Sequence, residues 1–171
     1  MVQTDTVRFT KKSVTCFLHC GDDYLFIHRT KKGNDTDAGK LNGIGGKLEY
    51  GENYLACAVR EIKEETGYVV AAAECQLVGL VNMVGGYQDD WVMAFFTAEV
   101  ASKIIPLGNE NGEGQLMWIN KRDVLKTKYE LVDDLHYCWD DICNSQQTFF
   151  VGAVVDKSEK IKKWSIVKQK K

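Results

Sequence analysis

Proline and long apolar runs are both scarce in this sequence. Its 171 residues include a single proline, Pro106, so the chain lacks the composition of a disordered spacer or a collagen-like segment. No uninterrupted apolar stretch approaches the roughly 18 residues that a membrane-spanning helix needs, and residues 1–12 carry Asp5 and Arg8 but no apolar signal segment. We therefore expect a cytoplasmic protein that has no membrane partner.

An excess of basic charge is also absent. The 22 Lys and Arg residues face 24 Asp and Glu residues, which gives a formal net charge of −2. Domains that bind duplex nucleic acid usually carry a basic excess, so we expect no duplex partner and a small-molecule ligand instead. With 44% hydrophobic residues, a chain of this length buries about 70% of its surface on folding, which favours one domain over residues 1–171.

The six cysteines lack both the spacing of a secreted disulfide framework and any C-x-x-C pair. His136, Cys138 and Cys143 lie close together in the sequence, but their spacing fits no common zinc motif. We therefore expect reduced thiols that pack as small apolar side chains.

Hydrophobic periodicity predicts a mixed order of strands and helices. β-prone runs over residues 13–18 and 24–28 flank a glycine turn and are typical of a hairpin. A helix is expected over residues 54–66, between the N-cap Asn53 and Gly67. Further strands are expected over residues 76–83, 91–100, 148–155 and 161–168, loops over 31–46 and 108–114, an apolar stretch over 116–119, and helical segments over 121–125 and 133–143. This order predicts an α+β fold with a mixed, mainly antiparallel sheet.

Three carboxylates share one face of the predicted helix. At 100° per residue, Glu61, Glu64 and Glu65 project from the side opposite the apolar stripe. Like charges three or four residues apart destabilise a helix by roughly 0.2 to 0.5 kcal/mol per pair, and Arg60 pairs with only part of this charge. A divalent cation would neutralise it, and hard oxygen ligands select Mg²⁺ or Mn²⁺; the alternative is a solvated acidic face.

A glycine-rich loop precedes this helix and favours the metal interpretation. Gly43, Gly45 and Gly46 are followed by a turn that contains Gly51 and Glu52. Such a loop allows backbone groups to approach a bound anion or metal without interference from a Cβ atom.

Residues 46–68 resemble the Nudix box of the Nudix hydrolases, G-x5-E-x7-R-E-U-x-E-E-x-G-U, where U is a bulky aliphatic residue. Only the last position departs, since Tyr68 stands where an aliphatic residue is usual. The resemblance implies a Nudix-type α/β/α sandwich and a metal-dependent hydrolase that cleaves the pyrophosphate linkage of a nucleoside diphosphate joined to another group. The matching residues are Gly46, Glu52, Arg60, Glu61, Ile62, Glu64, Glu65 and Gly67.

The resemblance also implies roles for individual residues. Glu61 and Glu65 are expected to hold Mg²⁺, for which Mn²⁺ is a possible substitute, and Glu64 is expected to be another ligand or a partner for water. The carbonyl of Gly45 is implied as a further ligand. Glu52 and Arg60 are expected to form a buried pair that braces the loop against the helix, the alternative being a surface ion pair of little energetic value.

Residues 39–49 are similar to the G-[KR]-W-N-G-x-G-G-K pattern of the MutT-like branch, with Leu41 in place of the tryptophan. Asn42 matches a position whose amide contacts the base, although an asparagine here also suits a turn. Arg29 resembles a phosphate-binding residue, the alternative being an exposed basic side chain. The implied substrate contacts in this part of the chain are Arg29, Asn42, Gly46 and Lys47.

Acidic residues at two places further along the chain, Glu113 and the pair Asp133 and Asp134, also resemble the MutT-like pattern. Glu113 precedes Trp118 in the arrangement E-x4-W, which implies an extra metal-binding or basic glutamate, with Glu110 or a solvated loop as alternatives. Asp133 and Asp134 resemble an acidic pair that reads the purine edge in some members, and such a pair in an apolar site tends to share a proton. Acids that complement a helix dipole are the alternative.

Other branches leave weaker traces. The proline that marks many ADP-ribose hydrolases is absent, and Tyr87 lies near a tyrosine position of dinucleoside polyphosphate hydrolases. The lysine-rich residues 157–171 suggest RNA binding, but Ile161, Trp164 and Ile166 favour a half-buried strand with solvated lysines. We expect hydrolysis of nucleoside triphosphates, oxidised purine ones such as 8-oxo-dGTP included, by a monomer or homodimer. A non-catalytic nucleotide-sensing module is disfavoured because none of the three helix glutamates is replaced.

Overall fold

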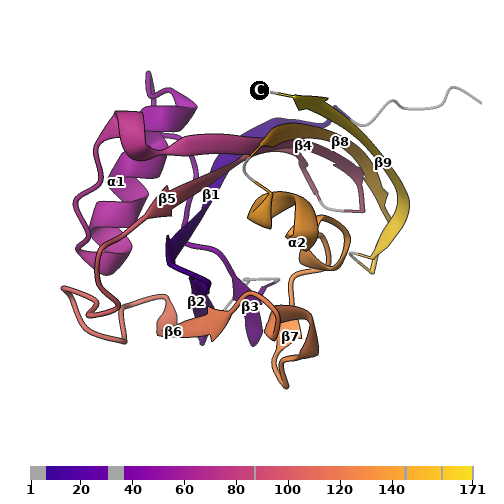
Figure 1. The fold of residues 1–171 in the computed structure, drawn as a ribbon. Helices are drawn as coiled ribbons and strands as arrows, with labels where there is room; N and C mark the ends of the chain where they lie inside the picture. The colour runs from indigo at the N-terminus through magenta and orange to yellow at the C-terminus, as the bar shows by residue number, and fades with distance from the viewer. Residues whose placement is uncertain (1–6, 31–36, 87, 145, 159, 171) are drawn as a thin grey trace, which may run out of the picture.

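In the part of the chain that the structure describes, residues 7–30, 37–86, 88–144, 146–158 and 160–170, nine strands form one curled sheet with a helix on each face (Figure 1). The structure is a computed structural model. Its strands are β1 (Thr10–Cys20), β2 (Asp23–Arg29), β3 (Lys40–Asn42), β4 (Gln76–Gly85), β5 (Asp90–Glu99), β6 (Gly114–Asn120), β7 (Glu130–Leu131), β8 (Gln147–Val155) and β9 (Ile161–Lys170). Its α-helices are α1 (Tyr54–Thr66) and α2 (Leu135–Cys143), and its 3₁₀ helices are η1 (Ala72–Glu74) and η2 (Val124–Lys126).

The sheet mixes parallel and antiparallel pairs. Its order is β7-β3-β2-β1-β5-β4-β8-β9, and β6 pairs with β2 beside this path. The β1/β5, β3/β7 and β4/β8 pairs are parallel, whereas the other five described pairs are antiparallel. The predicted α+β class with a mixed, mainly antiparallel sheet is therefore confirmed. Figure 1 shows β4, β8 and β9 arching over α2, with α1 on the other side of the sheet.

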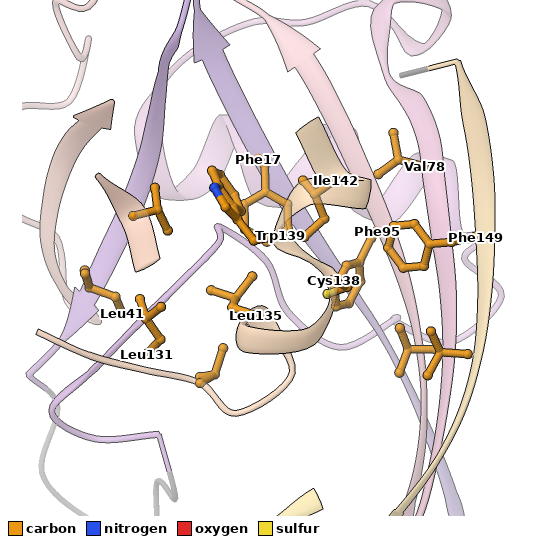
Figure 2. Packing of buried hydrophobic residues seen from close by; sticks show 14 of the residues in the cluster. Phe17, Leu41, Val78, Phe95, Leu131, Leu135, Cys138, Trp139, Ile142 and Phe149 are labelled. Atoms are coloured by element: carbon orange, nitrogen blue, oxygen red, sulfur yellow. The ribbon is translucent and has the colours of Figure 1, made fainter. Parts of the chain in front are cut away.

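Alternation along the strands divides the core into two apolar clusters. In β1, Val14 and Cys16 pack on the α1 side, whereas Phe17 packs on the α2 side, because successive side chains of a strand point to opposite faces. Figure 2 shows the second cluster, in which Trp139 of α2 lies against Phe17. Each helix therefore covers one face of the sheet, as expected for the implied α/β/α sandwich.

The sequence predicts both ends of α1 correctly. The side chain of Asn53 accepts a hydrogen bond from the Ala56 amide at 2.9 Å, and Gly67 ends the helix in the left-handed conformation with φ 78°. The Gly67 amide donates to the Lys63 carbonyl. Ala58 and Ile62 are fully buried against the sheet, which fixes the rotation of the helix and turns its acidic side toward the glycine loop.

Four short elements differ from the sequence expectations. The loop expected over residues 31–46 contains β3, whose pairing with β2 and β7 is a tertiary contact that a short polar run does not reveal. The helical segment expected over 121–125 is wrong: a turn leads there into the single-turn η2. Strand β7 and η1 were not expected. Residues 31–36 and Tyr87 lie outside the described part of the chain.

Neither of the two described α-helices is long and apolar enough to cross a membrane.

All six cysteines lie in the described part of the chain and are free thiols. Four of them are buried, namely Cys16, Cys57, Cys75 and Cys138. They contribute to the two apolar clusters as small packing residues.

The fold predicts that Trp139 is a main anchor of α2. Its side chain is 2% exposed, and its ring lies 5.1 Å from that of Tyr24 and 5.3 Å from that of Phe26. We expect Trp139→Ala to lower the free energy of unfolding by about 3–5 kcal/mol in urea titrations, because a large buried ring leaves a cavity. The exposed His136 on the same helix is the control, and His136→Ala should change stability by no more than about 0.5 kcal/mol.

Candidate active site

A bidentate ion pair joins the loop before α1 to the helix itself. The Nε and Nη2 atoms of Arg60 each donate to one carboxylate oxygen of Glu52 at 2.9 Å. The two side chains are only 21% and 13% exposed, and Arg60 also donates to the Lys47 carbonyl at 3.2 Å. The guanidinium and the Glu49 amide lower the pKa of Glu52 to about 2. The pair is thus largely buried, not a loose surface contact.

The glycine loop lies between β1 and α1, and it has no room for a side chain at Gly45 or Gly46. The Val14 amide donates to the Gly46 carbonyl at 2.9 Å, and the Cys16 amide donates to the Ile44 carbonyl at 2.6 Å. A Cβ atom on Gly45 would lie 2.1 Å from the Val14 carbonyl oxygen. A Cβ atom on Gly46 would lie 2.2 Å from Oε1 of Glu61. Both glycines are therefore required by close approach.

Two helix glutamates face this loop and crowd each other. The Gly45 amide donates to Oε2 of Glu65 at 3.3 Å, and Nη1 of Arg60 donates to Oε1 of Glu61 at 2.8 Å. Burial, followed by the charge of Glu61, raises the pKa of Glu65 to about 8. Burial also raises the pKa of Glu61, against the opposing effect of Arg60. Negative charge at this point is thus only partly balanced by the protein.

Glu64 lies in a different environment from its two neighbours. Its side chain is 60% exposed, and Oε2 accepts a hydrogen bond from Nη1 of Arg60 at 3.1 Å. It therefore lies at the outer edge of the acidic face, where water reaches it.

Arg29 and Glu113 approach the acidic helix from the other side. Nη2 of Arg29 donates to Oε2 of Glu113 at 2.6 Å. The charge of Arg29 lowers the pKa of Glu65 and that of Glu113 raises it, so both lie near that carboxylate. Pairing of β2 with β6 explains the approach, because it sets Arg29 opposite Gly114. Glu110, the alternative to Glu113, is exposed.

One residue at this junction was missed from the sequence. Asn111 connects the loop of Glu113 to the end of α1, since its Nδ2 donates to the Glu65 carbonyl at 3.0 Å. The available signal was an asparagine two residues before Glu113 in a glycine-rich loop, a residue type that commonly organises such turns.

Asn42 and Lys47 flank the glycine loop, one before Gly43 and the other after Gly46. Oδ1 of Asn42 accepts a hydrogen bond from the Gly43 amide at 2.7 Å, which is the turn that the sequence also allowed. The backbone of Lys47 forms an isolated β-bridge with that of Ser13. The Nζ atom of Lys47 lies 5.6 Å from the centre of the Trp91 ring. Leu41, which takes the place of the tryptophan, is fully buried. It therefore offers no surface to a base.

The two aspartates before α2 have separate surroundings. Oδ2 of Asp133 accepts a hydrogen bond from the Ile161 amide at 2.8 Å, whereas Asp134 is 8% exposed. Oδ1 of Asp134 has no hydrogen-bond partner among the described residues, and burial raises the pKa of this carboxyl to about 7. The structure thus ties Asp133 to the β9 backbone and makes Asp134 the buried member of the acidic pair.

The lysine-rich end of the chain forms β9, as predicted. Ile161, Trp164 and Ile166 are partly buried against the α2-side cluster. Three of the lysines pair with aspartates: Lys160 with Asp133, Lys162 with Asp156 and Lys168 with Asp141. Three of the six described lysines in this segment are therefore paired within the protein, which weakens the RNA interpretation.

The acidic helix and its loop suit a hard divalent cation. Among the described residues, no three acidic, His or Cys side chains lie close enough together to hold a metal ion by themselves. Mg²⁺ rarely needs three protein ligands, because it usually takes one or two carboxylates and completes its shell with waters and substrate phosphates. Glu61 and Glu65 supply two such carboxylates; burial first, and neighbouring carboxylates second, raise the pKa of each, and a bound cation would favour their charged forms. The absence of a Cβ atom at Gly46 allows the Glu61 carboxylate to lie directly against the loop.

A curled sheet between two helices, with an acidic helix behind a glycine loop, defines the class of the protein. The family model described as the NUDIX domain matches residues 10–139, most of the chain and all of the acidic site. The chain belongs to the Nudix family and is a Nudix hydrolase. Members of this family typically depend on divalent metals.

Individual relatives are more distant. The uncharacterised Nudix hydrolase YvcI of Bacillus subtilis is 27% identical over 120 residues, which cover 68% of this chain and 70% of that protein. The crystal structure of the mMutator MutT protein from Bacillus halodurans matches 91% of this chain and 97% of its own, with a TM-score of 0.75 at 20% identity. A MutT Nudix hydrolase from Burkholderia pseudomallei gives a TM-score of 0.63 at 20% identity, over 77% of this chain and 97% of its own. These two likenesses show the fold.

The Glu52–Arg60 pair predicts a specific loss of stability in acid. Because the folded pKa of Glu52 is about 2, below its ordinary 4.5, its stabilising effect is complete above pH 4.5 and disappears as the pH falls through 2. We expect Glu52→Gln to lower the free energy of unfolding by about 1 kcal/mol at pH 7 and by less at pH 3. Urea titrations at both pH values test this, with the exposed Glu49→Gln as control. An equal loss at the two pH values contradicts the assignment.

Because Gly46 lies close to the Glu61 carboxylate, we expect a substitution at Gly46 to preserve the fold and to lower the rate of hydrolysis. An alanine at this position forces the Glu61 carboxylate to move, whereas Gly112 has open space around its Cα and is the control. We expect Gly46→Ala to lower kcat/KM for hydrolysis by about 100-fold, the typical effect of a 1 Å misplacement, with a small change in Tm. Gly112→Ala should retain turnover. Full activity of Gly46→Ala would show that the position of Glu61 is unimportant.

Proposed function

We propose that the protein is a MutT-like pyrophosphohydrolase of nucleoside triphosphates, including oxidised purine ones such as 8-oxo-dGTP, which releases a nucleoside monophosphate and pyrophosphate. The observation that carries the proposal is the facing pair of half-buried carboxylates, Glu61 and Glu65, beside Arg29 and Glu113. The likeness in fold to proteins described as MutT supports this branch over others.

Glu61 and Glu65 are the residues that would hold Mg²⁺, or Mn²⁺ in its place. The carbonyl of Gly45, the exposed Glu64 and Glu113 are proposed as additional ligands or partners of ligand waters. A bound divalent ion polarises phosphoryl oxygens and lowers the pKa of a coordinated water. Arg60 and Glu52 do not touch the substrate in this scheme; they hold the loop at a fixed distance from the helix.

Arg29 is proposed to bind the phosphate chain. Its guanidinium is planar and suits two parallel hydrogen bonds to phosphate oxygens. It is only 19% exposed and is oriented by Glu113, so it enters the site in a fixed direction. Glu113 is the proposed acceptor of the proton from the attacking water, because it lies near Glu65 but keeps 31% exposure to solvent.

Gly46 and Lys47 are proposed to contact the substrate between the metal site and the base. Gly46 has no side chain and lies directly against the Glu61 carboxylate. Lys47 is exposed beside the loop and can approach an anionic phosphate after leaving the Trp91 ring.

Asn42 and Asp134 are the proposed contacts to the purine. The Val132 amide donates to the Leu41 carbonyl at 3.1 Å, and this pairing sets Asn42 beside the segment that leads into α2. A carboxyl with a pKa of about 7 exists in both protonation states near neutral pH, so Asp134 can donate to or accept from a base edge. Asp133 supports this segment through its bond to β9 and is proposed to act beside Asp134, not by sharing its proton.

A substrate panel tests the function. The protein is incubated with Mg²⁺ and, in turn, canonical and oxidised nucleoside triphosphates, diphosphate sugars and dinucleoside polyphosphates, and the products are identified by ion-pair chromatography. We expect monophosphate plus pyrophosphate from a triphosphate as the fastest reaction. A sugar phosphate or two mononucleotides as the preferred products would contradict the triphosphate assignment while retaining the family.

Glu65→Gln tests whether the acidic helix performs the reaction. We expect kcat/KM to fall by about 100-fold or more, because loss of a metal ligand removes several kcal/mol of transition-state stabilisation. Mn²⁺ should raise the Tm of the unaltered protein and have a much smaller effect on the variant. Glu110→Gln is a matched control on the exposed loop and should retain activity. If Glu65→Gln retained full turnover with Mg²⁺, the proposal that the acidic helix performs the reaction would be wrong.

A further inference from the structure

The side chain of Asn111 bonds to two segments that the sequence separates widely. Its Nδ2 donates to the Glu65 carbonyl at 3.0 Å, across 46 positions of the chain. Its Oδ1 accepts hydrogen bonds from the Glu113 amide at 2.9 Å and the Gly114 amide at 3.0 Å. One amide group therefore satisfies three backbone groups and joins the backbone of Glu65 to that of Glu113.

The bond to Glu65 uses a carbonyl that the helix cannot satisfy. The last four carbonyls of an α-helix have no partner further along the helix. In α1 the Lys63 carbonyl is taken by the Gly67 amide and the Thr66 carbonyl by the Leu107 amide. Asn111 caps the Glu65 carbonyl between them, so the loop is docked on the end of α1 at two points.

The loop is also fixed on its other side. The Thr30 amide donates to the Glu113 carbonyl at 3.1 Å, and Arg29 holds the Glu113 carboxylate. These contacts tie Glu113 to the end of β2. The two hydrogen bonds of the Asn111 side chain relate the Glu113 backbone to the helix of Glu65.

We propose that Asn111 is a positioning residue that sets the distance of Glu113 from Glu65, so that both carboxylates act on the same divalent ion. This inference rests on the proposed function, because it assigns a shared ion to the acidic site. Asn111 touches neither substrate nor metal in this scheme; it acts through Glu113. Partners that orient the primary ligands of a metal commonly change its affinity by about 10- to 100-fold when they are removed.

A double-mutant cycle measured by Mn²⁺ binding tests this role. Mn²⁺ alone is titrated by isothermal calorimetry into the unaltered protein, Asn111→Ala, Glu113→Gln and the double variant. We expect Asn111→Ala to weaken Mn²⁺ binding by about tenfold in the unaltered background and by less than about twofold when Glu113 is already replaced. Asn109→Ala, an exposed asparagine of the same loop, is the matched control and should leave the affinity unchanged.

Three results would overturn the inference. They are an unchanged Mn²⁺ affinity in Asn111→Ala, an equal loss in both backgrounds, which indicates a general effect on α1, and a Glu113→Gln variant with unaltered affinity. Circular dichroism melting identifies any variant that does not fold, and Asn111→Ser then takes the place of Asn111→Ala in the cycle. Because the readout is metal binding without nucleotide, it is independent of the substrate panel; loss of Mn²⁺ binding in Glu65→Gln reports separately on the proposed function.

Discussion

The ion pair between Arg60 and Glu52 is the interaction on which the candidate site depends. A single guanidinium holds Glu52 with two hydrogen bonds and also contacts Glu61, Glu64 and the Lys47 carbonyl. It thereby fixes the loop, the helix and two of the acidic side chains relative to one another. A lysine would not replace it, because an ammonium group lacks the planar fork that binds a carboxylate through two parallel bonds. The position of the loop relative to α1 therefore depends on the hydrogen bonds of one side chain.

This arrangement leaves an electrostatic imbalance that is consistent with a metal site. Arg60 carries one positive charge, yet Glu52, Glu61 and Glu64 all accept hydrogen bonds from it. Glu65 accepts a hydrogen bond from the Gly45 amide. A protein selected for stability alone would have little reason to bury Glu65, since burial raises its pKa to about 8. The cost is understandable where a cation and a phosphate chain complete the site during the reaction. Function, more than folding, explains the residue types on this face.

Local signals in the sequence predict one half of the site and not the other. The helix over 54–66, its Asn53 cap and its Gly67 end depend on neighbouring residues, so they could be read directly. The family resemblance implied that Arg60 pairs with Glu52, and the structure contains this pair. The role of Asn111 and the strands β3 and β7 depend on partners far away in the chain, which no local pattern specifies. The bond between Asp133 and the β9 backbone likewise depends on a distant segment that no local pattern specifies.

The topology explains why these distant parts meet at one place. β2 lies beside β1 in the sheet and pairs with β6 over its whole length, so the end of β2 and the start of β6 leave the sheet together. The glycine loop lies along β1 over the same region, and α1 packs on the face behind it. Arg29, Glu113 and Glu65 are therefore brought together by strand pairing and helix packing, each of which is stabilised by buried apolar area far from the charges. A polar site whose own contacts are unfavourable can persist at such a point, because the core on both faces of the sheet supplies the stability that the carboxylates do not.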